Sequence, residues 1–241
     1  MSHTKRRNLT LLFSCSLWIF FIWLEVLTKE LFIPNSSTKD KSLYSVHPGV
    51  TMVKEWIISL PKKAGRSLEE WINLIREHGP TTEIERRVWL KKKYNLGTNT
   101  AWWLTERVDG KGKEDSDPDL YLIEAEKWVD AMFADTKAGL LPIYHQLLKL
   151  GKKVGKDVII YPCKTIVPFY RNHVIAQIKP STRTRIDFGF ALKNSKAQQR
   201  LFDTGGFAKG DRISHRIPIT SLDEIDDEVK HWLKVAYDLD A

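Results

Sequence analysis

The sequence has 241 residues, of which 42% are hydrophobic and 28% charged, enough for one or two water-soluble domains with cores of their own. Its formal net charge of +8 favours acidic partners such as nucleic acid, nucleotides or anionic lipid. Its two cysteines cannot form a zinc site by themselves, and the Walker, GxGxxG, HExxH and GxSxG motifs are absent from the sequence. We therefore expect no metal and no cofactor.

Residues 1–51 begin with a basic run and continue into the apolar stretch LTLLFSCSLWIFFIWLEVL, residues 9–27. The uncharged part is slightly shorter than the roughly 20 residues that span a bilayer, and Glu25 interrupts it. No small residues follow at which a signal peptidase would cleave. One interpretation is therefore a single-pass membrane anchor, with the amino end in the cytoplasm by the positive-inside rule.

The other interpretation, which we favour, is that residues 1–51 are a misassigned start and that translation begins at Met52. Met52 is predicted to open an amphipathic helix, whereas residues 34–51 show no periodicity and are typical of a linker. The protein would then be cytoplasmic. A membrane partner is expected only if residues 9–27 are translated and inserted.

Residues 52–109 are predicted to form a small helical bundle. Capping boxes open two of its helices, because Ser67 is followed three residues later by Glu70, and Thr82 by Glu85. Apolar residues recur at helical spacing in residues 52–60, 67–79, 82–97 and 98–108.

The tryptophans of this segment are predicted to belong mainly to its core. Trp56 and Trp71 lie on apolar stripes, where aromatic residues usually pack inside. Trp102 and Trp103 are adjacent on one helix and cannot both face inward. One of these two side chains is therefore expected to be partly exposed.

The densest basic run of the bundle is a secondary candidate for contacts with phosphate. It comprises Arg86, Arg87, Lys91, Lys92 and Lys93. The alternative, which we favour, is a solvated basic face balanced by nearby glutamates.

Residues 110–119 are polar and rich in glycine, and they are predicted to be a flexible linker. Residues 120–241 are predicted to be an α+β domain in which helices pack on an antiparallel β-meander. Two helices come first, then four short strands with tight turns, a loop, a last strand at residues 215–220 and a helix capped by Ser221. Ile186, Phe188 and Phe190 alternate and are expected to face the core.

Two stretches resemble known families. LPKKAGRSLEEWINLIREHG and WLKKKYNLG are similar to domain of unknown function 4287, over about residues 52–108. PIYHQLLKLGKKVGKDVIIYPCK, KPSTRTRIDFGFAL and SHRIPITSLDEIDDEVKHWLKVAYD resemble domain of unknown function 5655, over about residues 125–239. Neither resemblance implies a known activity, and the histidine–glycine pair frequent in the first family is replaced here by TTEIE.

The candidate site is a basic face of the predicted sheet. Residues 152–196 contain ten lysines or arginines and two aspartates, an excess of eight positive charges. Guanidinium and ammonium groups held on a sheet suit phosphate or carboxylate. The candidate residues are Arg171, His173, Lys179, Arg183, Arg185, His215 and Arg216.

The sequence favours a noncatalytic binding module for an anionic partner, nucleic acid or a nucleotide first. One alternative is a protein-interaction or dimerisation module that forms a homodimer. The other is an enzyme of unrecognised type, since Asp157 and the QIK stretch ending at Lys179 weakly resemble a metal-dependent nuclease layout.

Overall fold

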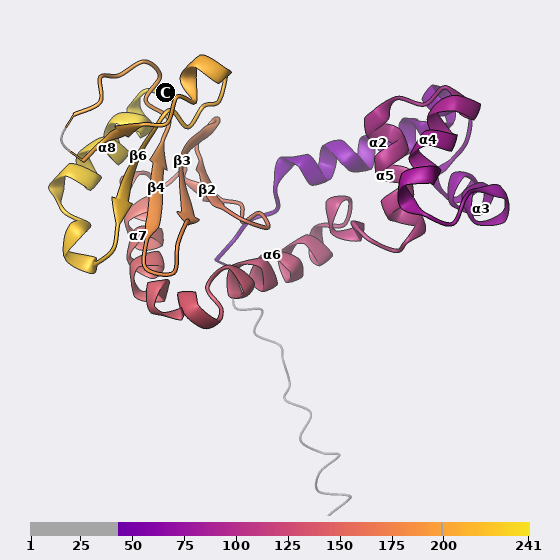
Figure 1. Ribbon diagram of the computed structural model, residues 1–241. Coiled ribbons are helices and arrows are strands. Elements are labelled where there is room, and N and C mark those ends of the chain that lie inside the picture. Colours follow the sequence, from indigo (N-terminus) through magenta and orange to yellow (C-terminus); the bar gives the residue numbers. More distant parts are fainter. Residues whose placement is uncertain (1–42, 199) are drawn as a thin grey trace, which may run out of the picture. The chain divides into compact units, whose positions relative to one another are not determined.

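The computed structural model describes residues 43–198 and 200–241, so the predicted membrane anchor at residues 9–27 lies outside the described chain. No helix within these ranges is long and apolar enough to cross a membrane. The described residues form an α+β protein, in which a group of helices precedes a six-stranded antiparallel sheet with its own helices (Figure 1).

The predicted helical bundle is confirmed. Its helices are α2 (Pro48–Ala64), α3 (Leu68–His78), α4 (Glu83–Tyr94) and α5 (Thr98–Val108). Both halves of the capping box at Ser67 and Glu70 are present, and the Thr82 side chain accepts a hydrogen bond from the Glu85 amide. The core of the bundle consists of Leu60, Trp71, Ile75, Leu90, Ala101, Trp103, Leu104 and Val108.

Helix α2 begins at Pro48, so the prediction that a helix opens at Met52 is wrong. The reason is local, because proline is favoured in the first turn of a helix and His47 caps it. The Nδ1 atom of His47 accepts a hydrogen bond from the Gly49 amide at 2.9 Å. Residues 48–51, the last four of the predicted linker 34–51, therefore belong to helix α2.

Residues 43–50, which we call the strap, contact the C-terminal half of the chain. The hydroxyl groups of Tyr44 and Tyr144 are hydrogen-bonded at 2.7 Å. The amide of Ser45 donates to the carbonyl of Ile160 at 3.1 Å. Val50 is 3% exposed and belongs to a small core with Tyr121 and Ala125.

The predicted linker, residues 110–119, is partly folded. It contains a 3-10 turn, η1 (Lys113–Asp115), and helix α6 (Pro118–Met132) begins inside it. The buried guanidinium of Arg107 holds the segment by donating to the Lys111 carbonyl at 2.8 Å and pairing with Asp115 at 3.5 Å.

The sheet contains β1 (Ile159–Ile160), β2 (Val167–Tyr170), β3 (Val174–Pro180), β4 (Ile186–Phe190), β5 (Phe202–Asp203) and β6 (His215–Ile219). Its strand order is β1-β2-β3-β4-β6-β5, with every neighbouring pair antiparallel. The meander therefore holds for the first four strands. The short β5 was not predicted, because two residues are too few to produce an alternating pattern.

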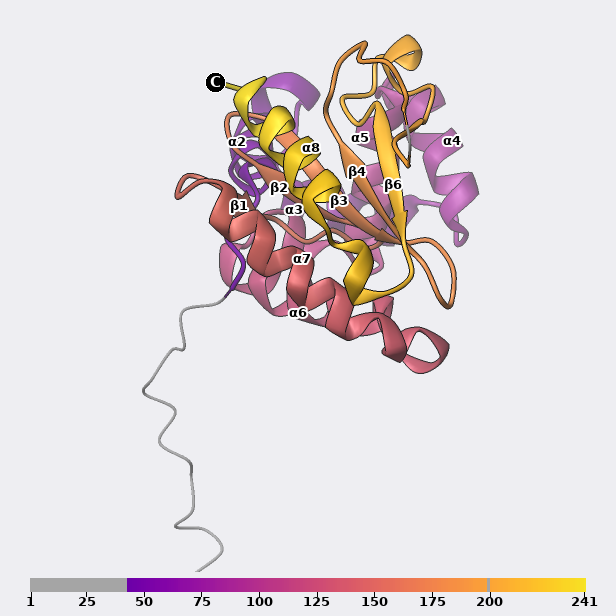
Figure 2. The same ribbon diagram turned by 90° about the vertical axis from the view of Figure 1, so that its left-hand side faces the viewer.

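Two helices cover one face of the sheet. Helices α7 (Leu141–Val154) and α8 (Asp227–Asp238) lie side by side across it (Figure 2). Ile186, Phe188 and Phe190 each have no exposed surface, which confirms the predicted alternation. We call the opposite face of the sheet the outer face.

The last helix begins later than predicted. The capping box of Ser221 and Glu224 forms, but the element that it begins is a 3-10 turn, η4 (Leu222–Glu224). Helix α8 is capped instead by Asp226, whose side chain accepts hydrogen bonds from the amides of Glu228 and Val229.

Candidate anion-binding site

Three of the predicted basic residues gather beside the outer face. Strand pairing sets Lys179 opposite Asp187, and it sets Arg216 opposite Gly189 on the neighbouring strand. Arg185 comes just before β4 and forms an ion pair with Asp187, with 3.0 Å between Nε and Oδ1. The Arg216 guanidinium donates to the same Oδ1 atom at 2.8 Å.

Asp187 is therefore the centre of this group. Its second carboxylate oxygen accepts a hydrogen bond from the Ser181 hydroxyl at 2.7 Å. With two arginines and a hydroxyl as partners, the carboxylate holds Arg185 and Arg216 in place and neutralises part of their charge. Asp187 is not among the candidate residues that the sequence predicts.

A hollow of about 520 Å³, which we call the basic hollow, opens beside these residues. The cationic side chains of Lys179, Lys209 and Arg216 line it, together with the carboxylates of Asp187 and Asp211. The three cations come from β3, from a loop and from β6. This volume falls within the roughly 300–1,000 Å³ range of ligand pockets.

Two glycines allow the loop of residues 204–213 to approach the sheet. A Cβ atom on Gly189 would lie 2.7 Å from the Cγ2 atom of Ile213. A Cβ atom on Gly206 would clash with the carbonyl oxygen of Ile213. Any side chain at either position would push the loop away and change the wall of the basic hollow.

This loop was missed as part of the site. The stretch TGGFAKGD belongs to the loop that the sequence predicts between the fourth strand and the last one. In the structure it contains a 3-10 turn, η3 (Phe207–Lys209), and it contributes Lys209 and Asp211 to the basic hollow. The signal available in the sequence was the pair of glycines followed by a lysine.

Arg171 and His173 lie elsewhere, in the turn between β2 and β3, where aspartates hold them. Arg171 Nε donates to Asp157 at 2.8 Å, and Tyr237 donates to the same carboxylate at 2.7 Å. These two hydrogen bonds, from Tyr237 and from Arg171, lower the pKa of Asp157. His173 contacts Asp240, with 2.9 Å between Nδ1 and Oδ1.

Asp240 fastens the end of the described chain to this turn, and we call this set of contacts the carboxylate clamp. Its side chain is 5% exposed and accepts hydrogen bonds from the amides of Asn172 and His173 at 2.9 and 2.8 Å. Arg212 also donates to it, at 2.9 Å. Burial raises the pKa of Asp240, but the hydrogen bonds from His173 and Asn172 outweigh burial and the net shift is downward.

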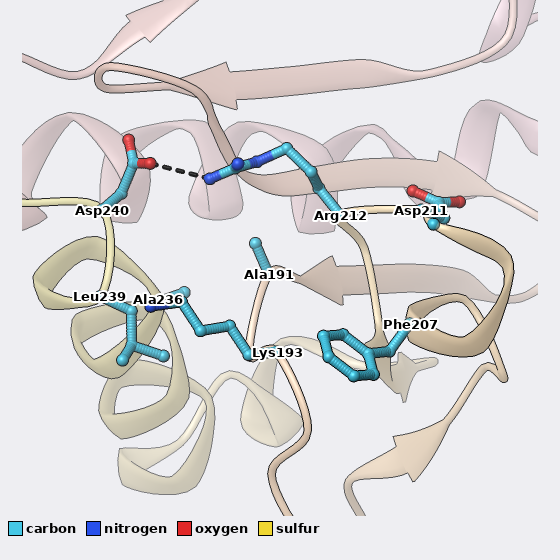
Figure 3. A pocket seen from close by; sticks show the side chains of 9 residues that line it. Ala191, Lys193, Phe207, Asp211, Arg212, Ala236, Leu239 and Asp240 are labelled. Atoms are coloured by element: carbon cyan, nitrogen blue, oxygen red, sulfur yellow. Dashed lines mark hydrogen bonds and ion pairs between the residues drawn. The ribbon is translucent and has the colours of Figure 1, made fainter.

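A smaller hollow of about 210 Å³ lies next to the clamp (Figure 3). Lys193, Phe207 and Arg212 line it, with Ala191 between them. Phe207 and Arg212 both belong to the loop of residues 204–213. The Arg212 guanidinium is already engaged by Asp240. The hollow is therefore less suited to an anion than the basic hollow.

The remaining two sheet candidates are separated from the basic hollow. His215 is 1% exposed, and its ring nitrogens lie 2.9 Å from the Ser214 hydroxyl and 2.9 Å from the Ser195 carbonyl. Arg183 lies in the exposed turn before β4, so its predicted place on the basic face of the sheet is wrong.

The basic run of the bundle is partly neutralised. Arg86 donates to Asp109, and Arg87 to Glu83. Lys93 lies 5.5 Å from the ring centre of Trp89. The other two members, Lys91 and Lys92, are exposed.

The nuclease-like pair is not brought together. Asp157 is bound at the Arg171 end of the sheet, whereas Lys179 pairs with Asp187 at the opposite end of β3. Among the described residues, no group of three or more histidine, cysteine or acidic side chains is arranged to hold a metal ion.

Comparison with protein families finds two matches, one in the helical bundle and one in the α+β domain. Residues 53–109 match a family described as domain of unknown function (DUF4287). Residues 129–240 match a family described as domain of unknown function (DUF5655). Comparisons with curated proteins and with solved structures find no match.

Proposed function

We propose that this chain, a DUF4287 domain followed by a DUF5655 domain, is a noncatalytic protein that binds a nucleotide or a nucleic-acid strand in the basic hollow. One observation carries the proposal. Lys179, Lys209 and Arg216 come from separate segments and line a single open hollow on the outer face of the sheet.

The charge balance supports a phosphate-bearing partner. Three cations stand against two carboxylates, and Arg185 also pairs with one of these, Asp187. An ammonium group is a mobile point charge that follows a phosphate, while the fixed guanidinium of Arg216 offers directed donors. Salt-dependent binding is the expected signature, because phosphate contacts release counterions.

Replacing Lys179 and Lys209 together by alanine is expected to weaken binding of a fluorescently labelled DNA single strand by at least about tenfold at low salt. The reason is the loss of two phosphate partners from the basic hollow. The plot of log affinity against log salt concentration should become less steep, by about 1.4 in its slope, because two phosphate contacts are lost. Fluorescence anisotropy across a salt series measures both quantities.

The matched control replaces Lys91 and Lys92 by alanine, which removes the same charge from the basic run of the bundle. Binding should be nearly unchanged in this variant. The reverse pattern, with loss only in the bundle variant, would move the site to the first domain. Unchanged binding after loss of both Lys179 and Lys209 would overturn the proposal.

A further inference from the structure

A second hollow, in the helical bundle, is lined mainly by tryptophans. It measures about 370 Å³, and its lining residues are Trp56, Asn99, Thr100, Trp102 and Trp103. We call it the tryptophan hollow. Helix α2 supplies Trp56, and the first two turns of α5 supply the other four residues.

Two of the three rings of this hollow, those of Trp56 and Trp103, are packed in place. Trp56 and Trp103 pack edge to face, with 4.6 Å between ring centres. The Arg107 guanidinium lies 4.1 Å from the centre of the Trp103 ring, which is 8% exposed. A ligand would therefore meet two walls that are already ordered, and ordering them would cost little conformational entropy.

Trp102 differs from its neighbours because it is 42% exposed. The guanidinium of Arg87 lies 5.9 Å from the centre of its ring. The core of the bundle includes Trp103 but not Trp102. Packing of the bundle therefore does not account for a large aromatic side chain at this position.

The charges around the tryptophan hollow decide between two kinds of ligand, a cation and an uncharged planar ring. Aromatic cages also bind quaternary ammonium groups. Here Arg87 and Arg107 lie against the rings, each paired with a carboxylate outside the hollow, Glu83 and Asp115. No carboxylate is among the described residues that line the hollow. The first turn of α5 also carries no acidic residue, so the positive end of its dipole is uncompensated there. These charges disfavour a cation.

We infer that the tryptophan hollow binds an unpaired base of single-stranded nucleic acid by stacking on Trp102. Every base has a π-face that can stack on an exposed ring. The negative backbone of the strand suits the positive end of the α5 dipole. The side chains of Asn99 and Thr100 supply hydrogen-bonding groups at the same hollow. The inference goes beyond the basic hollow, since it concerns the other domain and the bases instead of the phosphates.

The test compares a labelled strand of about 12 deoxythymidines with an abasic strand of the same length. The unaltered protein is expected to bind the thymidine strand about tenfold more tightly than the abasic one. Trp102→Ala should bring this ratio close to one and leave affinity for the abasic strand unchanged. Trp102→Phe, which keeps a ring, should retain most of the ratio.

Ile58→Ala is the control, because Ile58 is a 72% exposed apolar residue of α2 outside the hollow. It should leave the ratio unchanged. An equal ratio in the unaltered protein and in Trp102→Ala would overturn the inference, as would quenching of tryptophan fluorescence by tetramethylammonium but not by thymidine. Failure of the basic hollow would appear separately, as abasic-strand binding that survives loss of Lys179 and Lys209.

Discussion

A chain that begins at Met52 is expected to unfold with a free energy about 3 kcal/mol lower than a chain that begins at Leu43. The difference is the strap. Its removal takes Val50 out of the small core with Tyr121 and Ala125, which a buried valine stabilises by about 1.5–3 kcal/mol. It also removes the His47 cap, so α2 loses its first turn.

Urea unfolding followed by circular dichroism measures this difference. A single variant of the longer chain, Tyr44→Phe, should lose only about 1 kcal/mol, because it removes one hydroxyl from the pair with Tyr144. Equal unfolding midpoints for the two chain lengths would show that the strap contributes nothing to stability. A native start at Met52 would then carry no energetic cost.

Asp240→Ala is expected to lower the free energy of unfolding by about 3 kcal/mol at pH 7. The substitution leaves the amides of Asn172 and His173 without their acceptor and removes the partner of Arg212. Asp238→Ala is the matched control, since Asp238 is exposed and its ion pair is with Lys234 on the same helix. Exposed pairs of this kind contribute at most about 1 kcal/mol.

The effect of Asp240 should depend on pH with a definite sign. Its pKa is lowered in the folded protein, so its contribution is complete above the pKa of an unfolded aspartate, about 3.9. As the pH falls through the folded pKa, the carboxylate is protonated and the contribution is lost. Unfolding curves of Asp240→Ala and the unaltered protein should therefore converge in acid; a constant gap would contradict the clamp.

Local patterns in the sequence predicted the elements that depend on near neighbours. The capping box of Ser67 and Glu70 lies within three residues, and the alternation of Ile186, Phe188 and Phe190 lies within one strand. The start of α2 was predicted too late, because residues 48–51 are too few to show helical periodicity; the signal for it is the capping residue His47 followed by Pro48.

The candidate site depended on contacts that no local pattern contains. Asp240 accepts a hydrogen bond from the amide of His173, which lies 67 residues earlier in the sequence. This contact makes the turn between β2 and β3 part of the carboxylate clamp. Arg216 reaches Asp187 across 29 positions. Composition correctly predicted an excess of positive charge, but only the fold divides it between the basic hollow, the clamp and the buried His215.

The strand order has a consequence for how the second domain forms. In sequence β5 precedes β6, yet in the sheet β6 lies between β4 and β5. Residues 202–203 therefore have no strand to pair with until residues 215–219 have been synthesised. During synthesis the α3–α5 helices, which contact near neighbours, can assemble early, whereas the loop that carries Lys209 acquires its shape only with the arrival of β6.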